Sequence, residues 1–215
     1  MNKQQIVSAI QECMNFQAAT NALVNPEWKT AGYAWKRAMW VEAAELTDLV
    51  GYKWWKDLNK APDKKQILLE VVDIFHFLLS HTLVFRRYSA TDLYHGYQWA
   101  LKHSRVSEKE QQLQMIEEFV FNCLYDGEIV LHTSFFQMMN SLDIKIEDLL
   151  KYYIGKNALN KFRQDNGYKA GTYRKQWNFL GNQVEDNVVL EHIIENGTVF
   201  NFDSVYNQLS TMYNQ

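Results

Sequence analysis

Apolar residues recur every three or four positions along most of the chain, the spacing that places them on one face of an α-helix. The first such stripe contains Ile6, Ile10, Cys13, Met14, Gln17 and Asn21. It should end before Asn25-Pro26, a pair that favours a turn. Only 2 prolines and 9 glycines interrupt the 215 residues, so the pattern predicts an all-α protein, a compact helical bundle.

The remaining helices can be placed from the same pattern and from their start and stop signals. They are predicted at about residues 33–50, 64–85, 146–165, 188–195 and 203–212, with further helical stretches between residues 89 and 139. Pro62-Asp63 is a good signal for a helix start, and Asn166-Gly167 readily supplies the left-handed turn that closes a helix. Because the length suits one hydrophobic core, we expect a single domain over residues 1–215.

Charge and cysteine content narrow the function classes. A formal charge of −3 gives no overall basic field, so long nucleic acid is not an expected partner, whereas a small anionic ligand is compatible. Cys13 and Cys123 lie in apolar helical patterns, which suits buried thiols in a reducing compartment, and we expect a cytoplasmic protein. The N-terminus lacks the apolar run of a signal peptide, and the most apolar stretch, IFHFLLSHTLVF, is expected to be too short to span a bilayer. No membrane partner is therefore expected.

Two pairs of acidic residues depart from the apolar pattern. At steps of three and four, both pairs share a helix stripe with apolar residues: Trp35, Ala38, Glu42, Glu45 and Leu49 in one helix, and Glu70, Asp73 and Phe77 in the next. Two successive helices with a short connection could therefore point four carboxylates at one another. We expect these acids on the inner face of a helix pair, where they would line a central metal site.

Four carboxylates in a low-dielectric space repel one another and lose hydration, so they need a cation or must take up protons. An all-oxygen site favours Mg²⁺, with Mn²⁺ as a possible substitute, and Mg²⁺ commonly shares its coordination shell with substrate phosphates. Taken singly, each pair would more often be a set of exposed helix acids. A di-iron bundle is a weaker alternative, because it needs two Glu-x-x-His motifs and Asp73 with His76 provides a single Asp-x-x-His.

A basic and aromatic segment follows near the end of the chain. One helix face carries Lys156, Asn160 and Arg163 at steps of four and three. The segment GYKAGTYRKQW follows directly, adds Lys169 and Lys175, and is typical of a mobile basic loop. Such cations could hold phosphates that the metal does not reach, with arginine binding them through two parallel hydrogen bonds. Alternatively, they only neutralise the negative end of the helix dipole.

Two carboxamides, Gln17 and Asn21, occupy positions where the first helix should be apolar. A carboxamide both donates and accepts hydrogen bonds, as the edge of a pyrimidine base requires, although many buried amides are only satisfied core groups. Trp54, His76 and Phe77 could stack on such a base, but aromatic residues at helical spacing are more often part of the core. Uracil and cytosine both remain open, because a carboxamide can flip.

Several segments of the chain are similar to a known family. They are FQAATN, WVEAAELTDLVGYKWWK, EVVDIFHF and YIGKNALNKFRQDNGYKAGTYRKQW. They resemble the dimeric, all-α dUTPases of the all-α NTP pyrophosphatases, over the first eighty or so residues and about residues 152–177. The resemblance implies Mg²⁺-dependent hydrolysis of dUTP to dUMP and pyrophosphate, and of dUDP to dUMP and phosphate, through attack of a metal-activated water on the α-phosphorus. It also implies a homodimer.

The resemblance further implies roles for individual residues. It gives the metal site to Glu42, Glu45, Glu70 and Asp73, and it makes Glu45 the residue that orients or deprotonates the attacking water. It implies contacts to uracil from Gln17, Asn21, Trp54, His76 and Phe77. It implies that sugar and phosphates are held by Lys56, Lys156, Asn160, Arg163, Tyr168, Lys169 and Lys175. Deoxyuridine nucleotides are therefore the expected ligands.

The residues themselves leave alternatives open for the substrate and for turnover. A dCTP pyrophosphatase, or one with a broader choice of nucleoside triphosphates, would use the same carboxylates with a different base preference. A nucleotide-binding regulator would use the same pocket and form no product. Product analysis separates the regulator from any enzyme, and a panel of substrates separates dUTP from the other nucleotides.

Overall fold

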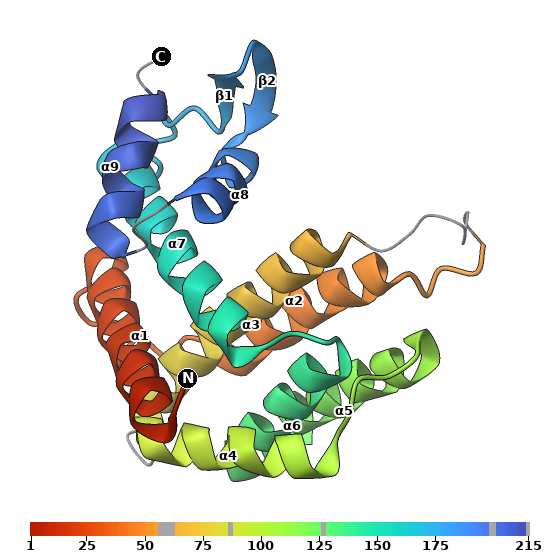
Figure 1. Cartoon of the computed structure of the whole chain (residues 1–215). Coiled ribbons are helices and arrows are strands. Elements are labelled where there is room, and N and C mark those ends of the chain that lie inside the picture. Colours follow the sequence, from red (N-terminus) through yellow and green to blue (C-terminus); the bar gives the residue numbers. More distant parts are fainter. Residues whose placement is uncertain (56–62, 86–87, 126–127, 198–200, 214–215) are drawn as a thin grey trace. The chain divides into compact units, whose positions relative to one another are not determined.

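The computed structural model of the chain describes residues 1–55, 63–85, 88–125, 128–197 and 201–213. The chain divides into two compact units, residues 1–150 and residues 151–215, and each is described by itself. Within the described residues the secondary structure is helical apart from one short hairpin in the second unit (Figure 1). The prediction of an all-α fold is therefore confirmed.

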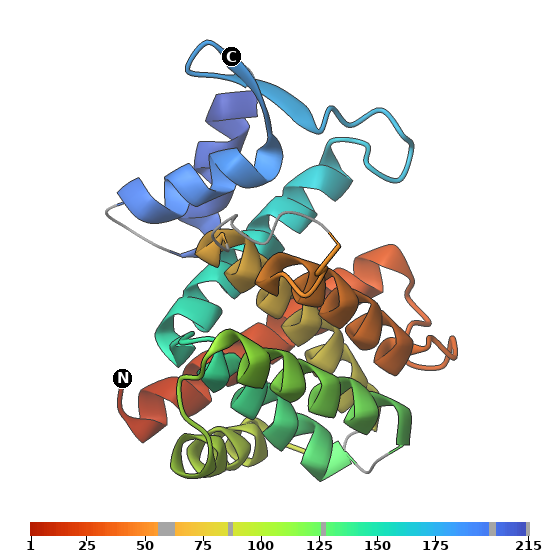
Figure 2. The same ribbon diagram turned by 90° about the vertical axis from the view of Figure 1, so that its right-hand side faces the viewer.

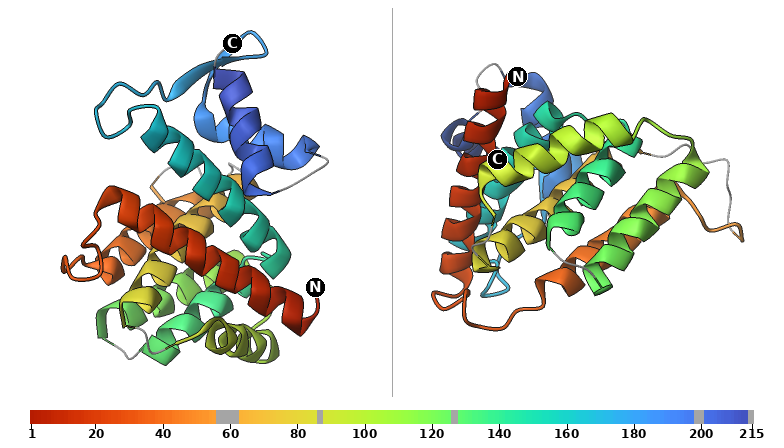
Figure 3. Two further views of the ribbon diagram at one scale, coloured as in Figure 1. Left: turned by 90° about the vertical axis from the view of Figure 1, so that its left-hand side faces the viewer. Right: turned by 90° about the horizontal axis from the view of Figure 1, so that it is seen from below.

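The first unit is a set of packed helices. They are α1 (Lys3–Val24), α2 (Trp35–Val50), α3 (Lys64–Phe85), α4 (Ala90–His103), α5 (Lys109–Tyr125) and α6 (Glu128–Ser141). The long helix α7 (Ile146–Asp165) begins in this unit and continues into the second. α2 and α3 are antiparallel neighbours, α5 packs on both α2 and α6, and α4 packs on α1 and α6 (Figure 1 and Figure 3).

Local sequence signals explain where several of these helices begin and end. The Asn2 side chain accepts a hydrogen bond from the backbone of Gln5, and the Gln5 side chain accepts one from the backbone of Asn2 at the start of α1. Ser89 and Asp92 form the same reciprocal arrangement at the start of α4. α2 ends at Gly51, whose φ of 89° lies in the left-handed region that glycine adopts without strain.

The core of the first unit is apolar and aromatic. Phe75 of α3 stacks on Phe135 of α6 with 5.4 Å between ring centroids, and Phe119 of α5 meets the same ring edge-on at 6.1 Å. α3 has 22 residues and is long and apolar enough to span a membrane, so the expectation that its apolar stretch is too short was wrong. Because 67% of its apolar window is buried, α3 has the character of a core helix.

The second unit combines the rest of α7 with a hairpin and two short helices (Figure 2). These elements are β1 (Gln176–Phe179), β2 (Asn182–Glu185), α8 (Asp186–Asn196) and α9 (Phe202–Tyr213). Leu180 and Gly181 form the hairpin turn, with φ values of 51° and 79°. Phe162 of α7 meets Trp177 of β1 at 5.7 Å and Tyr213 of α9 at 5.2 Å between ring centroids. An aromatic cluster therefore holds this unit together.

Most of the predicted helices are confirmed. The predicted stripe of α1 is buried, the turn that closes α7 has a φ of 89° at Gly167, and α8 and α9 include the residues expected for them. Both cysteines are buried free thiols, as expected. The hairpin was not predicted, because each strand has only four residues, and the predicted basic loop, residues 167–177, includes just the first two residues of β1.

Candidate functional site

Three carboxylates from the antiparallel pair α2 and α3 come together in the first unit. Glu42 and Glu45 lie one turn apart on α2, and Glu70 lies on α3. Each contributes an oxygen, and these atoms all lie within 4.8 Å of one another. Glu42 and Glu70 are half-buried and Glu45 is exposed. This cluster of three carboxylates, called the carboxylate group below, therefore lies at the border between core and solvent.

The acids lie beside the core stripe of α2 rather than on it. The buried residues of α2 are Met39, Ala43, Leu46 and Val50. All four directly follow a position of the predicted stripe, so the inner face is rotated by about 100°, the turn that one residue makes in an α-helix. The prediction that Glu42 and Glu45 share the core stripe was therefore wrong. At the border, a carboxylate retains hydration that full burial would remove, and it still meets its neighbour on α3.

The donor set of this group suits a divalent metal ion. Carboxylates at this separation repel one another when all are ionised, and a divalent cation removes that repulsion. Ligands that are all oxygen favour Mg²⁺ or Mn²⁺ over softer metals. Glu42, Glu45 and Glu70 are the residues that the structure gathers for such an ion, whereas Asp73, one turn further along α3 and half-buried, is not part of the group.

A buried ring of hydrogen-bonded polar side chains, called the amide ring below, joins Gln17 and Asn21 of α1 to His76 and Ser80 of α3. Gln17 Nε2 donates to Asn21 Oδ1 at 2.9 Å, and Asn21 Nδ2 donates to Ser80 Oγ at 2.9 Å. His76 Nδ1 lies 2.8 Å from Gln17 Oε1 and must be the donor, because a carboxamide oxygen only accepts. Ser80 Oγ donates to the backbone carbonyl of His76 at 2.9 Å. Gln17, Asn21 and His76 were predicted from the sequence, but Ser80 was missed. Its spacing of four residues from His76, which places both on one helix face, could have indicated it.

α3 therefore serves two kinds of chemistry along its length. Glu70 belongs to the carboxylate group, and His76, six residues later, belongs to the amide ring, about 9 Å further along the helix axis. Phe77 is half-buried and lies beside Trp35, with 6.4 Å between ring centroids. One helix can thus place a metal near one end of a ligand and hydrogen-bonding groups near the other.

The segment after α2 carries the remaining predicted residues of the first unit. Trp54 is 77% exposed and meets Trp55 edge-on, with 5.4 Å between ring centroids. Its indole ring is therefore not packed against the amide ring and presents a free apolar face at the surface. Lys56, predicted to bind sugar or phosphate, lies outside the described residues.

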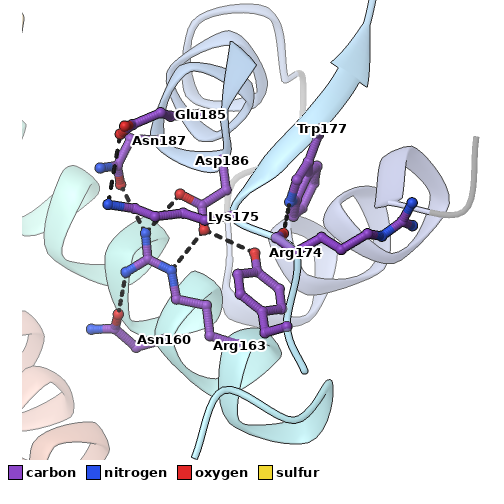
Figure 4. A network of polar contacts seen from close by, with 9 residues as sticks. Asn160, Arg163, Arg174, Lys175, Trp177, Glu185, Asp186 and Asn187 are labelled. Atoms are coloured by element: carbon purple, nitrogen blue, oxygen red, sulfur yellow. Dashed lines mark hydrogen bonds and ion pairs between the residues drawn. The ribbon is translucent and has the colours of Figure 1, made fainter. Parts of the chain in front are cut away.

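In the second unit, a buried carboxylate holds Arg163 (Figure 4). Arg163 Nε donates to Asp186 Oδ2 at 2.8 Å and Nη2 donates to Asp186 Oδ1 at 2.7 Å. The Tyr173 hydroxyl donates to Asp186 Oδ2 at 2.8 Å. Longer bonds run from Nη1 to Asn160 at 3.3 Å and from Nη2 to Asn187 at 3.4 Å, so the structure brings Asn160 and Arg163 together. The Asp186 side chain is fully buried, and that of Arg163 is 12% exposed.

This pairing fixes the protonation states of its donors. Burial alone would lower the pKa of Arg163, but the hydrogen bonds and the charge of Asp186 prevail and raise it above its ordinary value. Burial raises the pKa of Tyr173, and the negative charge of Asp186 raises it further. Arg163 is therefore a cation and Tyr173 a neutral donor at physiological pH. Sequence reasoning missed Tyr173 and Asp186, because Asp186 follows Arg163 by 23 residues and no helical spacing links them.

The other predicted phosphate ligands of the second unit occupy different environments. Lys156 is buried on α7, whereas Tyr168 and Lys169 are exposed in the turn that follows this helix. Lys175 Nζ lies 3.7 Å from a carboxylate oxygen of Glu185, and both side chains are about half exposed. The contacts described for the second unit gather Asn160 and Arg163 and leave Tyr168, Lys169 and Lys175 at its surface.

Comparison with known proteins adds the family. A model of the dUTPase family matches residues 9–168, which is most of the chain. The match includes the carboxylate group and the amide ring, and it ends before Tyr173 and Asp186. The comparison with curated proteins found no match. From its all-α fold, its carboxylates on two successive helices and this match, the chain belongs to the all-α dimeric dUTPase family and is an enzyme of the dUTP diphosphatase type.

Proposed function

We propose that the protein hydrolyses dUTP to dUMP and pyrophosphate with Mg²⁺, which Mn²⁺ can replace, and that it converts dUDP to dUMP and phosphate. The observation that carries this proposal is the gathering of Glu42, Glu45 and Glu70 on a helix pair whose α3 also contributes to the amide ring. Carboxylates suit a metal that binds phosphates, and carboxamides suit recognition of a base. We propose that both units act as one functional domain over residues 1–215.

The first part of the proposal concerns the reacting phosphorus. Glu42, Glu45, Glu70 and Asp73 hold the divalent ion, which when bound lowers the pKa of water and shares the charge of the phosphate oxygens. Glu45 aligns the attacking water or accepts its proton, and its exposure supports access by water. Attack is in line at the α-phosphorus, so the departing group is pyrophosphate from dUTP or phosphate from dUDP.

The second part concerns the base. Gln17 and Asn21 bind the edge of uracil, with Trp54, His76 and Phe77 beside it. The bonds to His76 and Ser80 support this role, because they restrict the flipping that left uracil and cytosine open in the sequence. A carboxamide offers both donors and acceptors, which are the groups that a base edge needs.

The third part concerns sugar and phosphates. The proposed ligands are Lys56, Lys156, Asn160, Arg163, Tyr168, Lys169 and Lys175. The raised pKa of Arg163 supports a permanent positive charge there, and a guanidinium group matches the geometry of a phosphate. Cations in these positions stabilise the charge of the departing phosphate or pyrophosphate.

We also propose a homodimer that acts in the cytoplasm. Phe121, Leu124 and Tyr125 of α5 are 55%, 56% and 74% exposed, and such a group of large apolar side chains is typical of an interaction surface. Two buried free thiols suit a reducing compartment. Light scattering after size-exclusion chromatography tests the assembly: a dimer that Tyr125→Glu converts to a monomer is expected, and a monomeric wild-type protein contradicts it.

Product analysis tests the function. The purified protein is incubated with Mg²⁺ and, separately, dUTP, dUDP, dCTP, dTTP and UTP, and the products are separated by chromatography. Selective formation of dUMP from dUTP and dUDP is expected, and omission of Mg²⁺ should abolish it. Formation of dCMP, or a broad set of products, would retain the carboxylate chemistry and replace the base assignment. Absence of any product would identify a nucleotide-binding regulator instead.

A further inference from the structure

Arg163 can offer a ligand only one of the two edges of its guanidinium group. An arginine binds an oxyanion either through Nε and Nη2 or through Nη1 and Nη2 at its end. Asp186 takes the first edge with bonds of 2.8 and 2.7 Å. The bonds at the second edge are 3.3 Å to Asn160 and 3.4 Å to Asn187, and both acceptors are uncharged carboxamide oxygens. The end of the guanidinium is thus held weakly and can exchange these bonds for a phosphate.

We infer that Asp186 is a positioning residue for nucleotide hydrolysis, which fixes Arg163 so that its Nη1 and Nη2 edge binds a phosphate of the substrate. The inference rests on the proposed function and adds to it a residue that lies outside the matched segment 9–168. Asp186 does not touch the nucleotide, because its side chain is fully buried. It acts through Arg163.

Asp186 also ties the basic loop to the same point. Its Oδ2 accepts the hydrogen bond from Tyr173, and its backbone N–H donates to the backbone carbonyl of Lys175 at 3.0 Å. One residue at the start of α8 therefore connects Arg163 on α7 with the loop that carries Lys169 and Lys175. Such preorganisation strengthens binding, because a long side chain that is already ordered loses less conformational freedom when the ligand arrives.

A purely structural ion pair is the competing explanation. In that case Asp186 only neutralises a buried cation, and its loss lowers stability without a selective effect on phosphates. The two explanations predict different effects on the binding of ligands with and without phosphates. A positioning role affects ligands in proportion to their phosphates, whereas a loss of folded protein affects a nucleotide and a nucleoside equally.

The experiment measures binding of two ligands to Asp186→Asn by titration calorimetry with Mg²⁺. The ligands are a dUTP analogue with an imido group between the α- and β-phosphates, which is not hydrolysed, and deoxyuridine, which has no phosphate. Asp186→Asn should weaken the analogue about tenfold or more, as expected for a lost charged hydrogen bond, and deoxyuridine by less than about twofold. Asp165→Asn is the matched control, because it removes an ion pair of the same unit at the surface, and it should leave both affinities unchanged.

A double-mutant cycle tests whether Asp186 acts through Arg163. Arg163→Lys retains the charge but loses the planar fork. In this background Asp186→Asn should weaken the analogue by less than about twofold, because the edge that Asp186 holds is no longer there. Additive effects would overturn the inference. Wild-type affinity of Asp186→Asn for the analogue, or an equal loss for both ligands, would also overturn it.

A second variant keeps the inference testable if circular dichroism shows that Asp186→Asn is unfolded. Tyr173→Phe keeps the ring and removes one hydrogen bond to Asp186, so it should weaken the analogue about two- to fivefold and leave deoxyuridine unchanged. No selective loss would overturn the inference. Product formation by the wild type separates the two levels: no dUMP from dUTP refutes the proposed function, whereas normal turnover with unaffected variants refutes only the role of Asp186.

Discussion

Helices α2 and α3 of the first unit bring like charges together, whereas α7 and α8 of the second unit pair opposite charges. Oxygens of Glu42, Glu45 and Glu70 lie within 4.8 Å of one another at the border of the core. Arg163 and Asp186 meet through two short bonds, and the carboxylate is fully buried. Gathered like charges weaken the fold until a ligand supplies the opposite charge, while the ion pair supplies it from the chain itself.

The difference in burial follows from this difference in charge. Carboxylates that need a cation lie where water can reach them, because full burial would remove the hydration of every charge. Asp186 can be buried, because three hydrogen bonds from Arg163 and Tyr173 replace its hydration. The first arrangement suits reception of a metal and its phosphates, and the second suits support of a side chain in a fixed position.

The largest effect is expected at Glu45, in the carboxylate group of α2 and α3. Glu45→Gln keeps the shape of the side chain but removes its charge and its ability to accept a proton, so turnover of dUTP should fall by about 10²-fold or more. Steady-state kinetics with saturating Mg²⁺ measure this effect. Glu117→Gln makes the same change at an exposed position of α5 and should retain full activity. Near-normal turnover of Glu45→Gln would remove Glu45 from its proposed role.

The next largest effect is expected on the stability of the fold, from the buried ion pair of Arg163 and Asp186. Arg163→Met leaves the buried carboxylate of Asp186 without its cation, which should lower the free energy of unfolding by about 3 kcal/mol or more. Combining it with Asp186→Asn removes the buried charge as well and should recover part of the loss. Urea unfolding, followed by circular dichroism, measures both. A double variant that is no more stable than Arg163→Met would show that the buried charge is not the cause.

Much of the first unit could be predicted from sequence, because its helices are amphipathic and their ends carry local signals. α1 ends before Asn25-Pro26, a pair that favours a turn, and α2 ends at Gly51, which adopts the left-handed conformation without strain. The pairing of Gln17 with Asn21 is also local, since residues four apart on a helix are neighbours. The hairpin was beyond such reasoning, because two strands of four residues contain too few positions for a period to appear.

The candidate site was predicted where it depends on spacing and missed where it depends on tertiary packing. Residue spacing placed Glu42 and Glu45 on one helix face, but which face is buried is decided by all the neighbours of α2, and Leu46 is buried instead. Asp186 and Tyr173 reach Arg163 only through the path of the hairpin and α8. No pattern within the chain encodes that path, so these residues could be found only in the structure.

A third effect concerns two buried histidines of the first unit, which hold no charge at neutral pH. Burial lowers the pKa of His81 and of His132 to about 4, and the positive charge of Lys36 lowers that of His81 further. Their ordinary value of 6.5 applies in the unfolded chain, so the unfolded state binds more protons between pH 6.5 and 4. The free energy of unfolding should therefore decrease as pH falls through this window, by at most about 3 kcal/mol for each histidine.

His132→Gln separates this effect from the titration of the acids. His132 Nε2 donates to Thr82 Oγ1 at 2.8 Å, because the hydroxyl hydrogen of Thr82 is used by the Leu78 carbonyl. A glutamine amide can replace that donor and does not titrate. Urea unfolding at pH 7.5 and pH 5 should show a smaller decrease for the variant than for the wild type. Equal decreases would show that His132 does not cause the loss of stability at low pH.

The smallest effect is expected at a second ion pair of α7, between Lys161 and Asp165. Both side chains are 35% exposed, so water screens the attraction, and Lys161→Met should change the free energy of unfolding by about 0.5 kcal/mol or less. Asp165 keeps the hydrogen bond from the Tyr206 hydroxyl at 2.7 Å. Urea unfolding of Lys161→Met beside Arg163→Met compares the same replacement at an exposed and a buried pair of one helix. If both variants lost equal stability, burial would not distinguish the pairs, and the contrast between hydrated like charges and a buried ion pair would lose its physical basis.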